Sequence, residues 1–111
     1  MRAILVIALC LLATPALADC GTIIMPPAQF NHPLAYDPTI HLMDYWALDR
    51  FCRGKGVVAS TGARVEACSV AAARTMWLPS GVSAERQKCY FIHERGHLEG
   101  WTSRHEGGVY Q

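Results

Sequence analysis

The stretch HERGHLEGWTSRHEGG, residues 93–108, holds three of the five histidines in the chain. His93 and His97 are four residues apart, so on a helix their imidazoles rise from one face, one turn apart. Two imidazoles in that arrangement suit a divalent metal ion. Glu94 lies roughly 100° round the helix from His93, beside such a metal rather than on it, where its carboxylate can hydrogen-bond a water. These residues predict a metal site with a neighbouring acid–base group.

The H-E-x-x-H motif of residues 93–97 resembles the catalytic helix of the zincin metallopeptidases. Gly100 extends the resemblance, because metzincins also place a glycine three residues after the second histidine. The resemblance implies a zinc ion (Zn2+) that activates a water, with Glu94 as the catalytic general base in peptide-bond hydrolysis. It also implies that RTMWLP, residues 74–79, is the edge strand along which a peptide substrate lies extended.

The chain departs from the zincin patterns at the third ligand. A metzincin would have a histidine at position 103, where this chain has Ser103, and gluzincins take a glutamate from a second helix further along. The longer spacing HExxHxxGWxxxH is similar to small uncharacterised exported bacterial proteins that are associated with secretion or conjugation genes. The family patterns therefore leave the third ligand open, and the distance that the chain can span after Gly100 limits which residues can return to the metal.

His105 is the predicted third metal ligand. The residues after Gly100 can extend about 3.3–3.6 Å each, which is enough to return across one helical turn to the metal. Glu106 is the alternative, because a carboxylate also binds zinc and the two glycines after it let the backbone turn either way. His32 and His41 lie in the first half of the chain and are expected to be surface or hydrogen-bonded histidines.

Two functions stay open on these residues. The first is an exported small zinc-dependent metallopeptidase that hydrolyses a peptide or protein substrate, such as an envelope or secretion-system component. The alternative is a non-catalytic, zinc-binding, disulfide-stabilised accessory or interaction protein of the envelope or a secretion system. The glutamate between the histidines favours the first, since a purely structural metal site needs no base, whereas the small size of the chain favours the second.

The histidine motif needs a helix to position it, and the sequence predicts one over residues 83–100. Ser83 is suited to the N-cap, an acidic residue follows in the first turn, and Gly100 ends the helix. A second helix is predicted over residues 39–54, with Thr39 as its N-cap and apolar residues at helical spacing.

Short segments that are β-branched or alternating predict a small antiparallel sheet over residues 56–60, 63–70 and 73–79. Four prolines deny residues 21–38 a regular helix and predict an extended arm laid across the body. The fold class expected is therefore α+β, a small disulfide-stapled domain with two main helices and a short antiparallel sheet. The H-E-x-x-H residues would lie on its C-terminal helix.

Of the five cysteines, Cys10 lies in the apolar run of a predicted signal peptide at residues 1–18, and the other four are predicted to form two disulfides, at least one of which ties the C-terminal helix to an upstream element. Their even number permits three connectivities, and the absence of any Cys-x-x-Cys pair disfavours a zinc site. Two bridges at roughly 2–4 kcal/mol each would be a large share of the stability of so small a domain. The four are Cys20, Cys52, Cys68 and Cys89.

Several further side chains have an expected place. Trp46, Trp77 and Trp101 are expected in the core or in a cleft wall rather than as a binding platform. Gly96 inside a helix costs about 1 kcal/mol relative to alanine, so a neighbour is expected to press close there. Tyr90, with Tyr110, is a candidate to stabilise an oxyanion.

Residues 1–18 have the layout of a cleavable signal peptide: a basic residue, an apolar run and a small-residue cleavage site. The apolar run is too short to span a bilayer. The expectation is a single zincin-like domain over residues 19–111, periplasmic or secreted, with no stable membrane anchor. Without Arg2, nine Lys and Arg face nine Asp and Glu, so the charge provides no basic field for nucleic acid.

Overall fold

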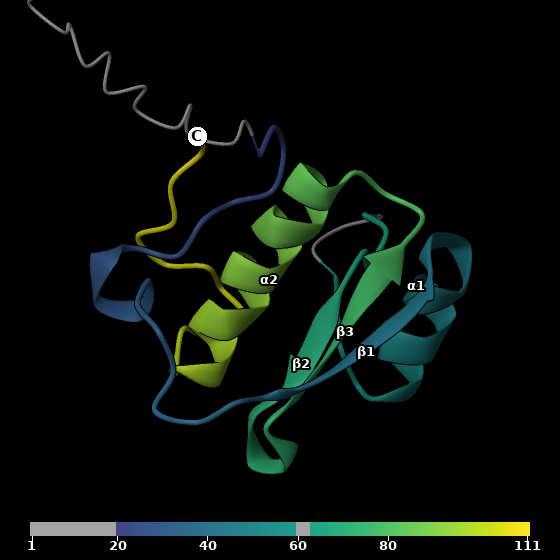
Figure 1. The fold of residues 1–111 in the computed structure, drawn as a ribbon, viewed down its shortest axis with the longest axis horizontal. Helices are drawn as coiled ribbons and strands as arrows, with labels where there is room; N and C mark the ends of the chain where they lie inside the picture. Colours follow the sequence, from purple (N-terminus) through teal and green to yellow (C-terminus); the bar gives the residue numbers. More distant parts are fainter. Residues whose placement is uncertain (1–19, 60–62) are drawn as a thin grey trace, which may run out of the picture.

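The computed structural model describes residues 20–59 and 63–111, so the predicted signal peptide at residues 1–18 lies outside the described residues. The described chain forms two α-helices, a three-stranded sheet and two short 3-10 helices (Figure 1). This confirms the predicted α+β fold, with the H-E-x-x-H residues on the C-terminal helix. In chain order the elements are η1 (Ala28–Phe30), β1 (Thr39–Asp44), α1 (Tyr45–Gly54), β2 (Cys68–Val70), η2 (Ala71–Ala73), β3 (Thr75–Ser80) and α2 (Ala84–Leu98).

The sheet is mixed, with the strand order β1-β3-β2. β1 runs parallel to β3, and β2 runs antiparallel to β3 with Cys68 opposite Trp77. The predicted antiparallel pairing of segments 63–70 and 73–79 is therefore present, whereas residues 56–59 form no strand. Because β3 is central, the prediction that residues 74–79 form a substrate-binding edge strand was wrong. The edge strands of this sheet are β1 and β2.

The helix predicted over residues 39–54 was wrong in its first third, which is the strand β1. Asp44, not Thr39, is the N-cap, because its carboxylate accepts hydrogen bonds from the N–H groups of Trp46 at 3.0 Å and Ala47 at 3.1 Å. The residues before Asp44 are extended because parallel pairing with β3 satisfies their main-chain groups. A tertiary contact thus overrides the helical spacing of the apolar residues in this segment.

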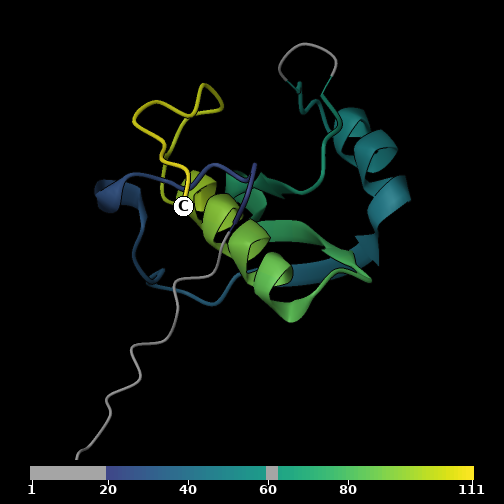
Figure 2. The same cartoon turned by 90° about the horizontal axis from the view of Figure 1, so that it is seen from above.

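The two helices pack against opposite faces of the sheet (Figure 2). Side chains alternate along β3, so Met76 and Leu78 lie in one core cluster with the α2 residue Tyr90. Trp77 points to the other face and packs against a second cluster that contains Leu48 of α1. The residues of α2 therefore belong to a layer separate from α1.

α2 begins and ends close to the predicted positions. The Ser83 hydroxyl accepts a hydrogen bond from the Arg86 N–H at 3.2 Å, and Glu85 follows in the first turn. After Leu98 the chain leaves the helix through Gly100, whose φ of +110° is unfavourable for a residue with a Cβ. The chain then turns back along the helix that it has just left.

An extended arm before β1 lies along α2, as the prolines predicted. The arm pairs with the C-terminal segment through Met25, whose N–H donates to the Val109 carbonyl at 2.7 Å, while the Val109 N–H donates back at 2.9 Å. Figure 1 shows the arm in purple and blue and the C-terminal segment in yellow, side by side along α2. Segments from the two ends of the described chain therefore meet at one helix.

Two disulfides staple these layers, which confirms the predicted number. Cys52–Cys68 joins α1 to β2 across a separation of 16 residues. Cys20–Cys89 spans 69 residues and ties α2 to the arm, not to the sheet. Disulfides are typical of proteins in an oxidising, extracytoplasmic compartment. None of the helices in the described parts of the chain is long and apolar enough to cross a membrane.

Candidate metal centre

Three imidazoles converge at the C-terminal end of α2. His93 and His97 rise from the same face of the helix, and their Nε2 atoms are 3.1 Å apart. His105 returns from the loop after α2 and brings its Nε2 atom to 3.1 Å from that of His97. One ring nitrogen from each of the three lies within 4.8 Å of the others, so these histidines could hold a metal ion.

Main-chain carbonyls decide the tautomers of the two helical histidines. The Nδ1–H of His93 donates to the Ile24 carbonyl at 2.6 Å, and that of His97 donates to the Trp101 carbonyl at 2.7 Å. A carbonyl oxygen can only accept, so each Nδ1 carries the hydrogen and each Nε2 of a neutral ring presents a lone pair. In metal sites, a hydrogen bond of this kind, from the ring nitrogen that does not bind the metal to a main-chain carbonyl, orients the histidine.

Burial disfavours the charged form of all three rings. It is the main cause that lowers the pKa of His93 to about 4, with smaller contributions from His97 and His105, and it also lowers the pKa of those two rings. Two lone pairs that face each other at 3.1 Å repel unless a cation lies between them. Since the buried site disfavours a proton, a metal ion is the cation that suits it.

The loop after α2 places His105 beside the two helical histidines. His105 has a φ of +55°, in the left-handed region, and its N–H donates to the Thr102 carbonyl at 2.9 Å. That tight turn directs the ring back at α2, and strain of this kind is often found at functional sites. Glu106 is exposed and is not among the converging groups of the described residues, so His105 is the candidate that the structure brings to the other two histidines.

Trp101 forms one wall of the site. It is 3% exposed, and its ring stacks on that of His97 at 4.9 Å between centroids with 17° between planes. It meets His93 and His105 edge-on at 5.1 and 4.8 Å. Its indole N–H donates to the Glu106 carbonyl at 2.9 Å, which holds the loop against the ring. Trp101 is buried, which agrees with the expectation that it lies in the core or in a cleft wall.

Gly96 has the close neighbour that the sequence predicted. A Cβ at this position would lie 2.7 Å from the Pro26 Cβ and 3.1 Å from a ring carbon of Trp101. Glycine is required because the arm crosses the helix at this point. The crossing brings the Ile24 carbonyl within reach of His93.

Glu94 is buried beside the imidazoles, with 4% of its surface exposed. Its Oε2 accepts a hydrogen bond from the Ser69 hydroxyl at 2.7 Å, and its Oε1 lies 3.9 Å from the Nε2 of His93. Burial raises the pKa of Glu94 to about 7, against a smaller lowering by the Ser69 hydrogen bond. A carboxyl group with a pKa in that range can both accept and release a proton at neutral pH.

The site opens into a cleft of about 830 Å³. His93, Glu94, His97 and His105 line it together with Ser69 of β2. The opposite wall includes the segment before β2, residues 63–67. The three histidines and the largely buried carboxylate therefore border a single cleft.

Tyr90 lines the same cleft but its hydroxyl is already engaged. Tyr45 and Tyr90 each donate to one oxygen of Glu66, at 2.6 and 2.7 Å. Burial and this hydrogen bond raise the pKa of Tyr90. The network ties α1 and α2 to the segment before β2, so the expected oxyanion role of Tyr90 has no support, while Tyr110 lines the cleft and is exposed.

No family model, no curated protein and no solved structure matches this chain. The function must therefore be argued from the geometry of its own residues.

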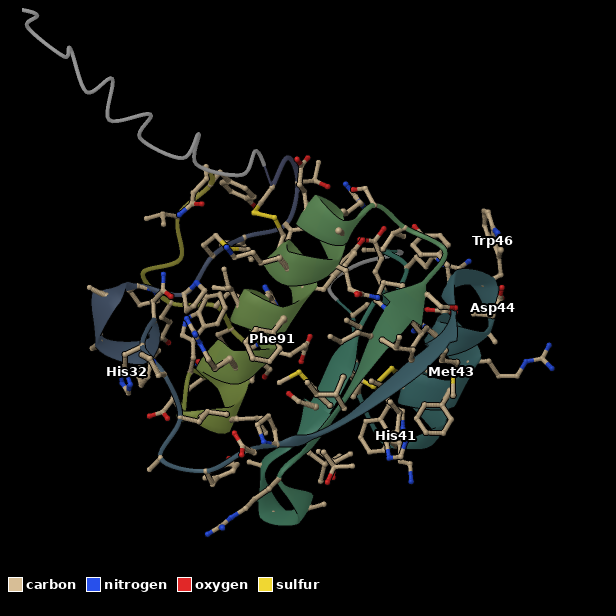
Figure 3. All side chains as sticks on the ribbon, viewed as in Figure 1. His32, His41, Met43, Asp44, Trp46 and Phe91 are labelled. Atoms are coloured by element: carbon tan, nitrogen blue, oxygen red, sulfur yellow. A yellow bond between two sulfur atoms is a disulfide. The ribbon has the colours of Figure 1, made fainter. Side chains whose placement is uncertain are left out.

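The remaining predicted positions lie away from the site (Figure 3). His32 contacts the carbonyl of Gln29 in η1 at 3.0 Å, and His41 of β1 stacks on Trp77 of β3, as expected for histidines outside a metal site. Trp46 points outward from α1 and is 73% exposed, so it does not lie in the core; it lines a shallow depression with Met43 and Phe51.

Sequence reasoning missed the groups that support the histidines. The Ile24 and Trp101 carbonyls belong to the main chain, so no residue type indicates them. Ser69 is one of several serines, and nothing in its local pattern distinguishes it. The one available signal was Gly96, which indicated a close crossing without identifying the segment that crosses.

Proposed function

We propose that this chain is an exported, small zinc-dependent hydrolase of the peptidase type. His93, His97 and His105 hold the zinc ion, and Glu94 is the general base. The observation that carries the proposal is the convergence of three imidazole nitrogens beside a buried carboxylate at the side of an accessible cleft. A site that only stabilised the fold would have no use for that carboxylate.

The donor set supports zinc as the metal. Zinc binds imidazole nitrogen at about 2.0–2.1 Å in tetrahedral geometry, which places two such nitrogens roughly 3.3 Å apart. Two of the three separations, from His97 to His93 and to His105, are 3.1 Å and close to that value, and all three nitrogens lie within 4.8 Å of one another. Three protein ligands also leave one position for water or substrate, which is the pattern of catalytic zinc sites.

The chemistry follows from the placement of the carboxylate. A zinc ion bound there supplies a Lewis acid and lowers the pKa of water beside it toward about 7. Glu94 directs Oε1 toward the imidazoles, where it can take the proton of the attacking water and deliver it to the leaving amine. A peptide or protein of the same compartment is the substrate class that fits, because the edge strand β2 offers main-chain hydrogen bonds along the cleft.

A structural role for the metal is the second candidate. The ligand histidines are hydrogen-bonded to Ile24 in the arm and to Trp101 in the C-terminal loop. A metal ion at this point would fasten both segments to α2. A protein with such a clip would bind zinc without any hydrolytic activity.

Metal analysis and a peptide-library assay test these proposals together. The protein should be purified with about one zinc ion per chain and should cleave peptides in a chelator-sensitive manner. Glu94→Gln should keep the zinc and lose about 10²–10⁴ in rate, because position 94 is the base and not a ligand. Bound zinc with no cleavage, and a melting temperature that falls on chelation, would favour the clip. Protein that lacks zinc after mild purification would overturn both.

A further inference from the structure

Ser69 is the polar side chain that connects the edge strand β2 to Glu94. It follows Cys68, whose side chain points toward α1 and forms the disulfide to Cys52. Because side chains alternate along a strand, Ser69 points to the opposite face, where α2 lies. There its hydroxyl donates to Oε2 of Glu94 at 2.7 Å.

The hydrogen bond leaves the two oxygens of Glu94 in different environments. Oε2 is occupied by Ser69, while Oε1 faces the His93 Nε2 atom at 3.9 Å. A glutamate carboxylate rotates easily about its last torsion, which is broad rather than confined to staggered wells. A donor on one oxygen therefore determines where the other oxygen points.

The main chain of Ser69 faces the free edge of the sheet. The Thr39 N–H donates to the Arg74 carbonyl at 2.9 Å, so in β3 the residues of even number direct their main-chain groups toward β1. Residues 75 and 77 therefore face β2 and bond their partners Val70 and Cys68. Ser69, which lies between these partners, directs its own N–H and C=O outward along the cleft.

We propose that Ser69 is the positioning residue for the general base. Its hydroxyl holds Oε2 of Glu94 so that Oε1 is presented to the metal-binding imidazoles. The same residue offers its main chain at the cleft edge, so a peptide bonded there would lie beside the carboxylate that Ser69 orients. This inference rests on the proposed function, and it adds a residue outside the metal-binding segment.

Substitutions at position 69 separate the hydroxyl from the bulk of the side chain. Ser69→Thr keeps a hydroxyl. Ser69→Val introduces a side chain of nearly the same shape as threonine but without the hydroxyl, and both residues are favourable in a strand. Ser69→Ala is the simple deletion, and Ser103→Ala is a control that removes an exposed serine lining the same cleft. If Ser69→Ala does not fold, the Thr and Val variants still provide the comparison.

Acetohydroxamate is the probe, because it binds zinc through two oxygens and offers a hydroxyl hydrogen to a carboxylate beside the metal. Its dissociation constant for the zinc-loaded protein should rise about tenfold in Ser69→Ala and Ser69→Val, which corresponds to one hydrogen bond to a charged group. Ser69→Thr and Ser103→Ala should stay within about twofold of wild type. In a cleavage assay, kcat should fall with KM unchanged, and threonine should restore it.

The outcomes distinguish this inference from the function on which it rests. Full zinc occupancy with equal acetohydroxamate affinity in the Thr and Val variants would overturn the role of Ser69 alone. A wild type that holds zinc but does not bind acetohydroxamate would have no open metal position, which overturns the catalytic proposal and the role of Ser69 together. Protein without zinc would overturn the metal centre itself.

Discussion

Main-chain partners determine what the histidines can do. Ile24 and Trp101 accept the Nδ1–H hydrogens of His93 and His97, and burial disfavours the charged form of both rings, so the Nε2 atoms are left free to bind a metal ion. His105 completes the cluster from a strained backbone conformation that the surrounding loop holds in place. The site is thus oriented by contacts that the ligand residues themselves do not reveal.

His105→Ala should abolish tight zinc binding, whereas Glu106→Ala should not. Loss of a group that only orients a ligand typically costs 10–100-fold in metal affinity, so loss of a ligand should cost more than about 100-fold. Glu106 is exposed, and only its main chain contacts the site through the Trp101 indole. Competition with a chromophoric chelator measures both dissociation constants. Equal weakening by the two variants would mean that Glu106 is also a ligand.

The crossing of α2 and the arm is the structural element on which the centre depends. Gly96 lets Pro26 lie directly on the helix, and that contact brings the arm to His93. The helix has a further anchor through Cys89 in its second turn. One contact before the motif, at Cys89, and one within it, at Gly96, therefore hold α2 against the arm.

Gly96→Ala should destabilise the protein although alanine is the better helix former. The added Cβ would lie 2.7 Å from that of Pro26, and overpacking of this kind typically costs 1–3 kcal/mol. Gly54→Ala in α1 is the matched control, because nothing lies within 4 Å of its Cβ and about 0.5–1 kcal/mol of stabilisation is expected. Urea unfolding of both variants measures the difference. A stabilised Gly96→Ala would show that the arm does not press on the helix.

Asp49 joins α1 to the segment before β2 and should make stability depend on acid pH. Its carboxylate accepts from the Val65 N–H at 2.9 Å and the Arg53 Nε–H at 2.8 Å, and the first of these is the main cause that lowers its pKa below the ordinary value of 3.8. Because the pKa of Asp49 is lower in the folded state, the group stabilises the protein at pH values above its pKa in the unfolded state. That stabilisation is lost as the pH falls through its pKa in the folded state. Urea midpoints from pH 6 to pH 2 should therefore fall less steeply in Asp49→Asn. Parallel profiles would contradict this role.

At the scale of the whole molecule, the two disulfides lie in different layers, and only one of them is attached to a segment that contacts the candidate metal centre. Cys52–Cys68 staples the α1 layer, on the face of the sheet away from the histidines. Cys20–Cys89 fastens the arm four residues before Ile24, whose carbonyl orients His93. The long bridge is therefore the one that constrains the segment in contact with His93.

Replacing either cysteine pair with alanine should lower the free energy of unfolding by about 2–5 kcal/mol, but only one of the two replacements should weaken the affinity for zinc. Without Cys20–Cys89 the arm is less constrained, and zinc affinity should fall about tenfold, as for other losses of a ligand-orienting partner. Without Cys52–Cys68 the zinc affinity of the folded protein should remain within about twofold. Calorimetry on both variants measures the two constants. Equal affinities would show that the arm holds its position without the bridge.

Patterns in the sequence predicted the structure correctly where an element depends on interactions between residues close together in the chain. The spacing of His93 and His97 and the cap at Ser83 predicted the helix that carries the motif, because both depend on a single turn of backbone. The prediction failed at β1, where the hydrogen-bond partners belong to a strand more than thirty residues away. His105 was placed by reach alone, because a short loop leaves few positions for it.

The sequence by itself determined the ligand types, the helix that presents two of them, and the cysteines that form the bridges. Only the tertiary structure decided which strand is the edge, which cysteines pair, and which groups orient His93, His97 and Glu94. The physical reason is that these decisions depend on contacts between segments distant in the chain. Ile24 acts through a carbonyl that every residue has, and Ser69 acts because strand alternation and sheet order bring its hydroxyl to Glu94.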